Sequence, residues 1–249
     1  QNSITTFVLL LVPAVMLSHL AHADTYDARL GGMDMIKASI LFLLVVGIVD
    51  TVQRLKVLLF AATAGVFAMT VLAVMQYHGL LHLPALESVV QGSPDPDNPV
   101  LLIRLCGIGV FNDPNDFSLV LIIAMIECAY VLGERRLRWV RWAFLIPMAL
   151  FAYAMILTHS RGGLLAAVAA MLVFLHARFG WRNMLPVAML LLPLLLVPAW
   201  GRQTSLNLDD PEDTFQTRIE LWYASLDVFR SAPLLGIGHE KLVDVIGRV

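Results

Sequence analysis

The sequence predicts an all-α, multi-pass membrane protein with about seven transmembrane helices and a partial helical loop outside the membrane. Of its residues, 59% are hydrophobic and 14% are charged, whereas soluble domains average about 25% charged residues. The apolar residues fall into blocks, each long enough to cross a hydrocarbon core of about 30 Å as a helix. The expected spans are residues 5–22, 36–50, 57–76, 117–133, 142–158, 163–178 and 183–200.

The chain is expected to have two parts, a transmembrane bundle at residues 1–200 and the beginning of a periplasmic loop at residues 201–249. Within the second part, residues 214–230 place apolar side chains at helical spacing between charged ones, which is typical of a surface helix. The apolar positions are Ile219, Trp222, Leu226 and Phe229. Because no hydrophobic segment follows this helix, we expect the chain to be a piece of a longer protein.

The connections between the apolar blocks alternate between basic and acidic, and this pattern predicts the orientation of the protein. The basic connections are residues 53–56, 134–141 and 176–182. The connections with most of the acidic residues are 24–35, 77–116 and the segment after Trp200, and the tight turn at 159–162 falls on their side. By the positive-inside rule, the basic connections are cytoplasmic and the others are periplasmic.

Arg161 lies in a tight turn between two apolar blocks, with almost no loop to solvate its charge. One interpretation is that the side chain extends to headgroup phosphates at the membrane interface. The other is a functional charge, because a lone arginine is atypical of the outer face and the adjacent Gly162 and Gly163 allow another group to approach the backbone closely. The residues of the turn, which also include Ser160, leave both interpretations open.

Arg104 precedes a turn-rich segment that leads directly into the fourth apolar block. Asn112, Asp113 and Asn115 in this segment are suited to turns and to an N-cap. The simpler interpretation is a capped helix start beneath a loop. The functional interpretation is a polar lining in which Arg104 is available for an anionic group.

Arg218 and Trp222 stand one turn apart on the expected surface helix, ahead of residues 233–238 (PLLGIG). Guanidinium groups suit bidentate contacts with phosphate, so several arginines on one face would make a diphosphate site. A solvated helix face is the competing explanation for these residues.

Glu127 lies within the fourth apolar block, where an acid is costly and therefore indicates a function by default, although it could equally be a neutral, hydrogen-bonded packing residue. The histidines at positions 78, 82, 159 and 239 lack the spacing of metal ligands, so we expect no metal. The sequence contains no basic nucleic-acid footprint, which argues against nucleic acid as a partner.

Three segments together resemble the O-antigen ligase and polymerase superfamily, namely residues 160–165 (SRGGLL), residues 111–117 (FNDPNDF) and residues 218–238. The order of these segments along the chain and their predicted side of the membrane are also similar to those of the superfamily. The resemblance implies a glycosyltransferase of the bacterial inner membrane that acts on its periplasmic face without a cofactor. Its partners would be an undecaprenyl diphosphate-linked oligosaccharide donor, membrane lipids, and a hydroxyl acceptor on lipid A core, another glycan or a protein.

The resemblance also assigns roles to residues of this chain. Arg161 and Arg218 would bind the donor diphosphate, with Arg104 as a third candidate. The supporting residues would be Asn115, Ser160, Gly162 and Trp222. The family's catalytic histidine lies further along the loop than Val249, and His239 comes too early to match it. The catalytic residue is therefore unassigned, and the chain as given is expected to be inactive by itself.

Two functions from other classes remain open at the level of the sequence. One is a transporter of a small anion such as bicarbonate, in which Glu127 would serve a transport pathway. The other is a non-catalytic membrane scaffold. Transport requires polar groups near the middle of the membrane, whereas the arginines of this chain concentrate at the outer ends of the expected spans, which favours chemistry on a lipid headgroup.

Overall fold

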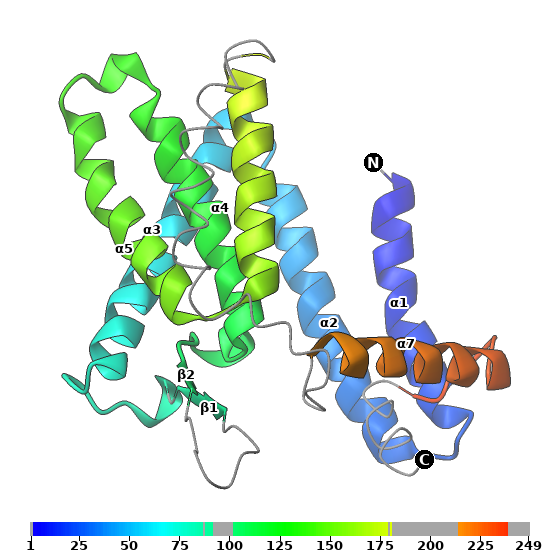
Figure 1. Cartoon of the computed structure of the whole chain (residues 1–249). Helices are drawn as coiled ribbons and strands as arrows, with labels where there is room; N and C mark the ends of the chain where they lie inside the picture. Colours follow the sequence, from blue (N-terminus) through cyan, green and yellow to red (C-terminus); the bar gives the residue numbers. More distant parts are fainter. Residues whose placement is uncertain (1, 87, 92–101, 179, 181–213, 239–249) are drawn as a thin grey trace, which may run out of the picture. The chain divides into compact units, whose positions relative to one another are not determined.

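The computed structural model describes residues 2–86, 88–91, 102–178, 180 and 214–238 of the chain. Most of these residues are helical (Figure 1), which confirms the all-α fold class. They fall into two compact units, the first within Gln1–Leu55 and Leu206–Val249 and the second within Lys56–Ser205. The expected division into a bundle and a periplasmic loop near residue 200 remains a prediction.

Six helices in the described part of the chain are long and apolar enough to cross a membrane. Each overlaps one of the first six expected spans, so the multi-pass architecture is confirmed. The candidate spans are Ser3–Leu20, Thr25–Ile48, Val52–Tyr77, Pro114–Leu132, Val140–Leu157 and Arg161–Arg178. The seventh expected span, residues 183–200, lies outside the described residues.

Helices α1 (Asn2–Leu20) and α2 (Thr25–Ile48) pack together in the first unit (Figure 1). The expectation that residues 24–35 form a loop is wrong, because α2 begins at Thr25. The Asp24 carboxylate caps this helix by accepting the backbone N–H of Asp27 at 3.2 Å. A polar first turn therefore extends the helix well before its apolar stretch.

Two glycines explain why this polar segment of α2 is helical rather than a loop. Gly31 and Gly32 are buried against α1, and a Cβ atom at Gly32 would lie 2.8 Å from Cγ of Met16. Small residues allow two helix backbones to approach closely. Their role here is helix packing.

Helix α3 (Val52–Tyr77) also begins earlier than expected. The basic residues 53–56, expected as a cytoplasmic connection, form its first turns. The Thr51 hydroxyl accepts the backbone N–H of Arg54 at 3.3 Å, as an N-cap does. The connection between α2 and α3 is correspondingly shorter than expected.

The long segment between α3 and α4 contains a short antiparallel strand pair that the sequence did not predict. Strand β1 (Val89–Gln91) pairs with β2 (Leu102–Arg104), and Val89 lies opposite Arg104 in the register. The pair ends at Arg104, and the following residue, Leu105, donates its backbone N–H to the carbonyl of Leu157 at 3.0 Å. This contact ties the segment to the end of α5.

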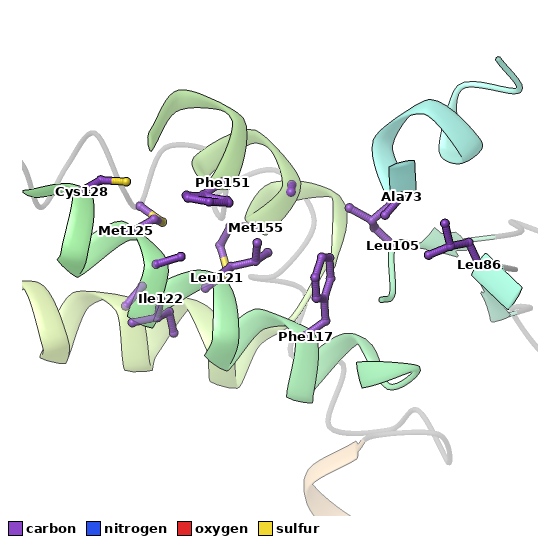
Figure 2. Close-up of a cluster of buried hydrophobic side chains, with 13 residues drawn as sticks. Ala73, Leu86, Leu105, Phe117, Leu121, Ile122, Met125, Cys128, Phe151 and Met155 are labelled. Atoms are coloured by element: carbon purple, nitrogen blue, oxygen red, sulfur yellow. The ribbon is translucent and has the colours of Figure 1, made fainter. Parts of the chain in front are cut away.

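The rest of the second unit is a run of helices. Its elements are α4 (Pro114–Leu132), two 3-10 turns (Arg135–Leu137 and Val140–Phe144), α5 (Leu145–Leu157) and the helix Arg161–Arg178, called the Arg161 helix below. Helix α4 contributes the largest share of buried side chains. Figure 2 shows Phe117, Leu121 and Met125 of α4 facing Phe151 and Met155 of α5 in the hydrophobic core. Phe117 and Phe151 are fully buried.

Helix α7 (Thr214–Ser231) in the first unit confirms the expected surface helix. Trp222, Leu226 and Phe229 are exposed on it, at 71%, 51% and 64% of their full surface. The loop after α7 contacts the end of α1, because the Gly238 N–H donates to the Ser18 hydroxyl at 3.1 Å.

Candidate functional site

Three segments of the second unit meet at one end of its helices: the end of β2, the start of α4 and the turn between α5 and the Arg161 helix (Figure 1). Five polar residues from these segments form hydrogen bonds with one another, and we call this group the polar junction. Its members are Arg104, Asn115, Ser118, Thr158 and Ser160. The junction contains three of the residues that the sequence assigned to the site.

The turn after α5 places Ser160 as the N-cap of the Arg161 helix. The Ser160 hydroxyl accepts the backbone N–H of Gly163 at 3.0 Å, and its carbonyl accepts that of Leu164 at 3.0 Å. His159 bends the chain into this position with a φ of +49°, a conformation that non-glycine residues adopt uncommonly. Arg161 is therefore the first residue of its helix.

The start of α4 is capped in a similar way, as expected from its sequence. The Asp113 carboxylate accepts the backbone N–H of Asn115 at 2.6 Å and that of Asp116 at 3.3 Å, with Pro114 at the first helical position. A proline suits this position because its missing N–H would have no helical partner there. The expected cap at the start of α4 is confirmed, and the functional interpretation of Arg104 remains a prediction.

The side chain of Asn115 joins the two helix starts to Arg104. Its carbonyl oxygen accepts the Ser160 hydroxyl at 2.7 Å and the Nη2 group of Arg104 at 3.4 Å. The Arg104 Nε group also donates to the carbonyl of Thr158 at 3.0 Å. The guanidinium is thus oriented by an amide and a backbone carbonyl.

Arg104 is half-buried, and two features of its surroundings shift the pKa of its guanidinium in opposite directions. Burial lowers the pKa of its guanidinium, while the charge of Asp113 raises it. Because the pKa of arginine lies far above neutrality, the group keeps its charge. A partly desolvated guanidinium interacts more strongly with an anion than a fully hydrated one does.

Arg161 differs from Arg104 in being exposed. Within the part of the chain that the structure describes, no hydrogen bond or ion pair reaches its guanidinium. The group stands beside the polar junction, because Ser160 immediately before it is 3% exposed and bonded to Asn115. A rigid backbone therefore presents a cation whose donors are available to a ligand.

The two glycines after Arg161 have different roles. Gly162 is exposed, and a Cβ atom there would meet nothing within 4 Å. At Gly163 a Cβ atom would lie 2.6 Å from Cβ of Ser118 on α4. The close approach that the glycines were expected to permit is therefore the packing of the Arg161 helix on α4, and only Gly163 provides it.

Ser118 and Thr158 belong to the polar junction but were not among the predicted site residues. The Ser118 hydroxyl donates to the Asn115 carbonyl at 2.6 Å and lies 3.5 Å from the Ser160 hydroxyl. Both side chains are fully buried. A serine three residues after Asn115 is a weak signal, and no local pattern connects either residue to Arg104.

The chemistry available at this end of the unit is anion binding. Two helix N-termini contribute partial positive charge, and Arg104 and Arg161 add two full charges. Guanidinium groups form charge-assisted, bidentate bonds with phosphate oxygens. The arrangement suits a phosphate-bearing ligand.

Arg218 and Trp222 lie on α7, in the first unit rather than the second. Arg218 belongs to the second turn of this helix, and Trp222 follows one turn later with an exposed side chain. The grouping of Arg218 with Arg161 in one diphosphate site remains a prediction.

Glu127 has a partner on a neighbouring helix. The Thr63 hydroxyl of α3 donates to its Oε2 atom, and the residue is half-buried. Its Oε1 atom is buried and has no hydrogen-bond partner among the described residues. The hydrogen bond with Thr63 links α3 to α4, as the packing interpretation of Glu127 predicts.

One group of side chains in the described residues could hold a cation, although the sequence did not point to it. His19, Asp24 and Asp27 gather at the turn between α1 and α2, with ligand atoms within 4.8 Å of one another. The Asp24 carboxylate is already used there as the N-cap of α2. None of the three belongs to the predicted site, so the expectation of a metal-free site remains a prediction.

Part of the chain is similar to a known protein family. A family model described as O-antigen ligase matches residues 146–248. The matched stretch contains Ser160, Arg161 and Gly162 at the turn and Arg218 and Trp222 on α7, while Arg104 and Asn115 lie before it. No curated protein and no solved structure shows a significant match to the chain.

Proposed function

We propose that the protein is a membrane glycosyltransferase acting on a lipid-linked glycan, because residues 146–248 match a family model described as O-antigen ligase. In this proposal the donor is an undecaprenyl diphosphate-linked oligosaccharide, and the glycan passes to a hydroxyl acceptor. The acceptor hydroxyl belongs to lipid A core, to another glycan or to a protein. Membrane lipids surround the spans.

The observation that carries the proposal is the exposed Arg161 on a hydrogen-bonded support. Its neighbour Ser160 is held by Asn115, which also accepts from Arg104. This support fixes the direction in which the Arg161 side chain leaves the helix. Because the backbone is held in place before the ligand arrives, binding of a diphosphate needs to order only the Arg161 side chain.

The proposed reaction is a direct displacement at the anomeric carbon of the donor. The acceptor oxygen forms a bond to this carbon while the bond from carbon to the diphosphate oxygen breaks, and the bonding electrons stay on the diphosphate. The acceptor proton passes to a general base, which is not assigned to a residue. Arg161 and Arg104 would neutralise the charge that develops on the leaving diphosphate.

The proposed orientation places this chemistry on the periplasmic side of the bacterial inner membrane. In the second unit, the polar junction lies at one end of the helices and the arginine-rich connection between α4 and α5 lies at the other (Figure 1). The Arg178 guanidinium at the end of the Arg161 helix donates to the Gly133 carbonyl at that basic end. The positive-inside rule makes the basic end cytoplasmic.

The test is to replace Arg161 in the full-length protein and measure transfer of glycan from a purified lipid-linked donor. Loss of a preorganised donor to developing charge lowers the rate by about 10²–10³, so we expect at least a hundredfold loss for Arg161→Ala. Arg161→Lys should recover part of the activity, because it restores the charge but not the bidentate geometry.

The matched control is Arg136→Ala, which removes the same type of side chain from the opposite end of the unit. It should retain normal transfer at equal expression. Normal transfer by Arg161→Ala would overturn the proposal and favour the scaffold. The transporter would be favoured if the native protein had no transfer activity and Arg161→Ala lost anion uptake into vesicles.

A further inference from the structure

The basic end of the second unit contains a surface hollow that the proposed reaction does not use. Five side chains from the connection between α4 and α5 line a volume of about 280 Å³, and we call this group the basic hollow. Its members are Arg135, Arg138, Trp139, Arg141 and Trp142. Three cations and two indole rings thus surround one concave surface.

Positive charge at this end is poorly balanced by the protein itself. Besides the arginines of the basic hollow, Arg136, Arg178 and Lys56 lie at this end, since Arg178 donates to the Gly133 carbonyl and Lys56 stands 5.8 Å from the Tyr130 ring. In the part of this unit that the structure describes, none of these cations forms an ion pair. The nearby Glu134 carboxylate accepts the backbone N–H of Arg136 at 3.4 Å.

Arg141 is the member of the basic hollow whose donors are most clearly unsatisfied. Its Nε atom is buried and has no hydrogen-bond partner among the described residues. The guanidinium carbon lies 5.0 Å from the centroid of the Trp142 ring, which holds the group in place by a cation–π contact. A buried donor without a partner is costly unless a ligand or water accepts its hydrogen.

The apolar surroundings of the basic hollow identify the kind of anion. Trp139 is 81% exposed, and the neighbouring Val140 and Ile146 are 66% and 71% exposed. Ile146 belongs to α5, so this apolar surface continues from the hollow onto a candidate span. Tryptophan and arginine at the end of a span are typical of the level of the lipid headgroups. A ligand there meets cations at one end and hydrocarbon at the other.

We propose that the basic hollow is a binding site for the headgroup phosphate of an anionic phospholipid. Arg138 and Arg141 donate to the phosphate oxygens, and the indole rings of Trp139 and Trp142 pack against the glycerol and the first acyl carbons. Free inorganic phosphate offers the same oxygens but no acyl chain. Because the site lies at the end of the helices opposite the polar junction, it is independent of the proposed glycosyl transfer.

The test measures lipids retained by the full-length protein in native mass spectrometry, with titration of phosphatidylglycerol against phosphatidylcholine. Loss of a hydrogen bond between a guanidinium and a phosphate oxygen changes affinity by about tenfold or more. We expect Arg141→Gln and Arg138→Gln each to weaken phosphatidylglycerol binding by at least this factor. The matched control is Arg136→Gln, which removes the same charge from the same connection without altering the hollow, and it should bind as the native protein does.

The outcomes separate a defined site from diffuse attraction. Equal weakening by Arg136→Gln and Arg141→Gln would show that only total charge matters and would overturn the proposal. Competition by inorganic phosphate at concentrations that match the lipid phosphate would assign the site to free phosphate instead, which also overturns it. Thermal unfolding of each variant without added lipid shows whether the variant is folded. If Arg141→Gln is unfolded, lipid binding by Arg138→Gln tests the proposal instead.

Discussion

The polar junction and the basic hollow lie at opposite ends of the same helices, and they hold their arginines in different ways. At the junction, Arg104 donates to the Thr158 carbonyl and to Asn115, and Asn115 also accepts from Ser160. At the hollow, Arg141 has a buried Nε atom with no partner among the described residues. One end is preorganised by the protein, and the other is completed by its surroundings.

This difference relates to what each end would contact. Orientation of a reacting group requires donors whose positions are fixed before the ligand arrives, which buried hydrogen bonds provide. Contact with a fluid layer of headgroups requires charge and an amphipathic rim but little precision. The expected effect of a mutation therefore depends on the end at which it is made.

The largest expected effect is a difference in cysteine labelling between the two ends of the helices, which tests which end faces the periplasm. The two native cysteines are buried, and burial raises the pKa of the Cys106 thiol, so background labelling by maleimide should be slow. A cysteine introduced by His82→Cys, in the segment between α3 and α4, should react with an impermeant maleimide added to intact spheroplasts. One introduced by Arg136→Cys should react only after the membrane is opened. Labelling of Arg136→Cys alone in intact spheroplasts would invert the proposed orientation.

The next effect tests whether the junction is preorganised by Asn115. Asn115→Ala removes the acceptor for both Ser160 and Arg104, and displacement of a catalytic group by about 1 Å can cost up to a hundredfold in rate. We expect glycan transfer by the full-length protein to fall about tenfold to a hundredfold. Asn112→Ala is the control, because its exposed side chain in the same segment lies outside the junction. Equal transfer by both variants would contradict the role of Asn115.

A smaller effect is expected from filling the contact between the Arg161 helix and α4. Gly163→Ala would force a Cβ atom to within 2.6 Å of Cβ of Ser118, and overpacking of this kind costs about 1–3 kcal/mol. We expect a lower midpoint of thermal unfolding in detergent. Gly65→Ala is the control, because a Cβ atom there would meet nothing within 4 Å. An unchanged midpoint for Gly163→Ala would mean that the two helices are not in close contact.

The sequence predicted which segments are helical better than it predicted the residues at which these helices begin. Apolar blocks mark the six described spans because length and composition suffice to cross a bilayer. The start of α2 was missed because Asp24 and the following polar turn read as a loop, whereas Gly32 packs against Met16 of α1. That contact depends on another helix, which local composition does not report.

The candidate site shows the same division between local and long-range signals. The caps at Asp113 and the turn at Ser160 follow from short motifs, and α7 follows from its periodicity. The bonds from Arg104 to Thr158 and from Ser160 to Asn115 join residues that are 54 and 45 positions apart. No single-sequence pattern connects such residues, so the polar junction could be seen only in the folded chain.

The smallest expected effect tests whether an acid inside a span carries the function instead of the polar junction. Glu127 accepts a hydrogen bond from Thr63 of α3, and the amide oxygen of glutamine can accept the same bond. Glu127→Gln should therefore leave glycan transfer unchanged and alter stability by less than about 1 kcal/mol, the net worth of a typical hydrogen bond. Glu127→Ala removes the acceptor and leaves the Thr63 hydroxyl without this hydrogen-bond partner, so it should lower the unfolding midpoint more.

Loss of activity in Glu127→Gln at an unchanged midpoint would mean that an ionisable group is needed in the membrane, as a transport path requires. The functional centre would then lie within the helices rather than at the end that carries the polar junction.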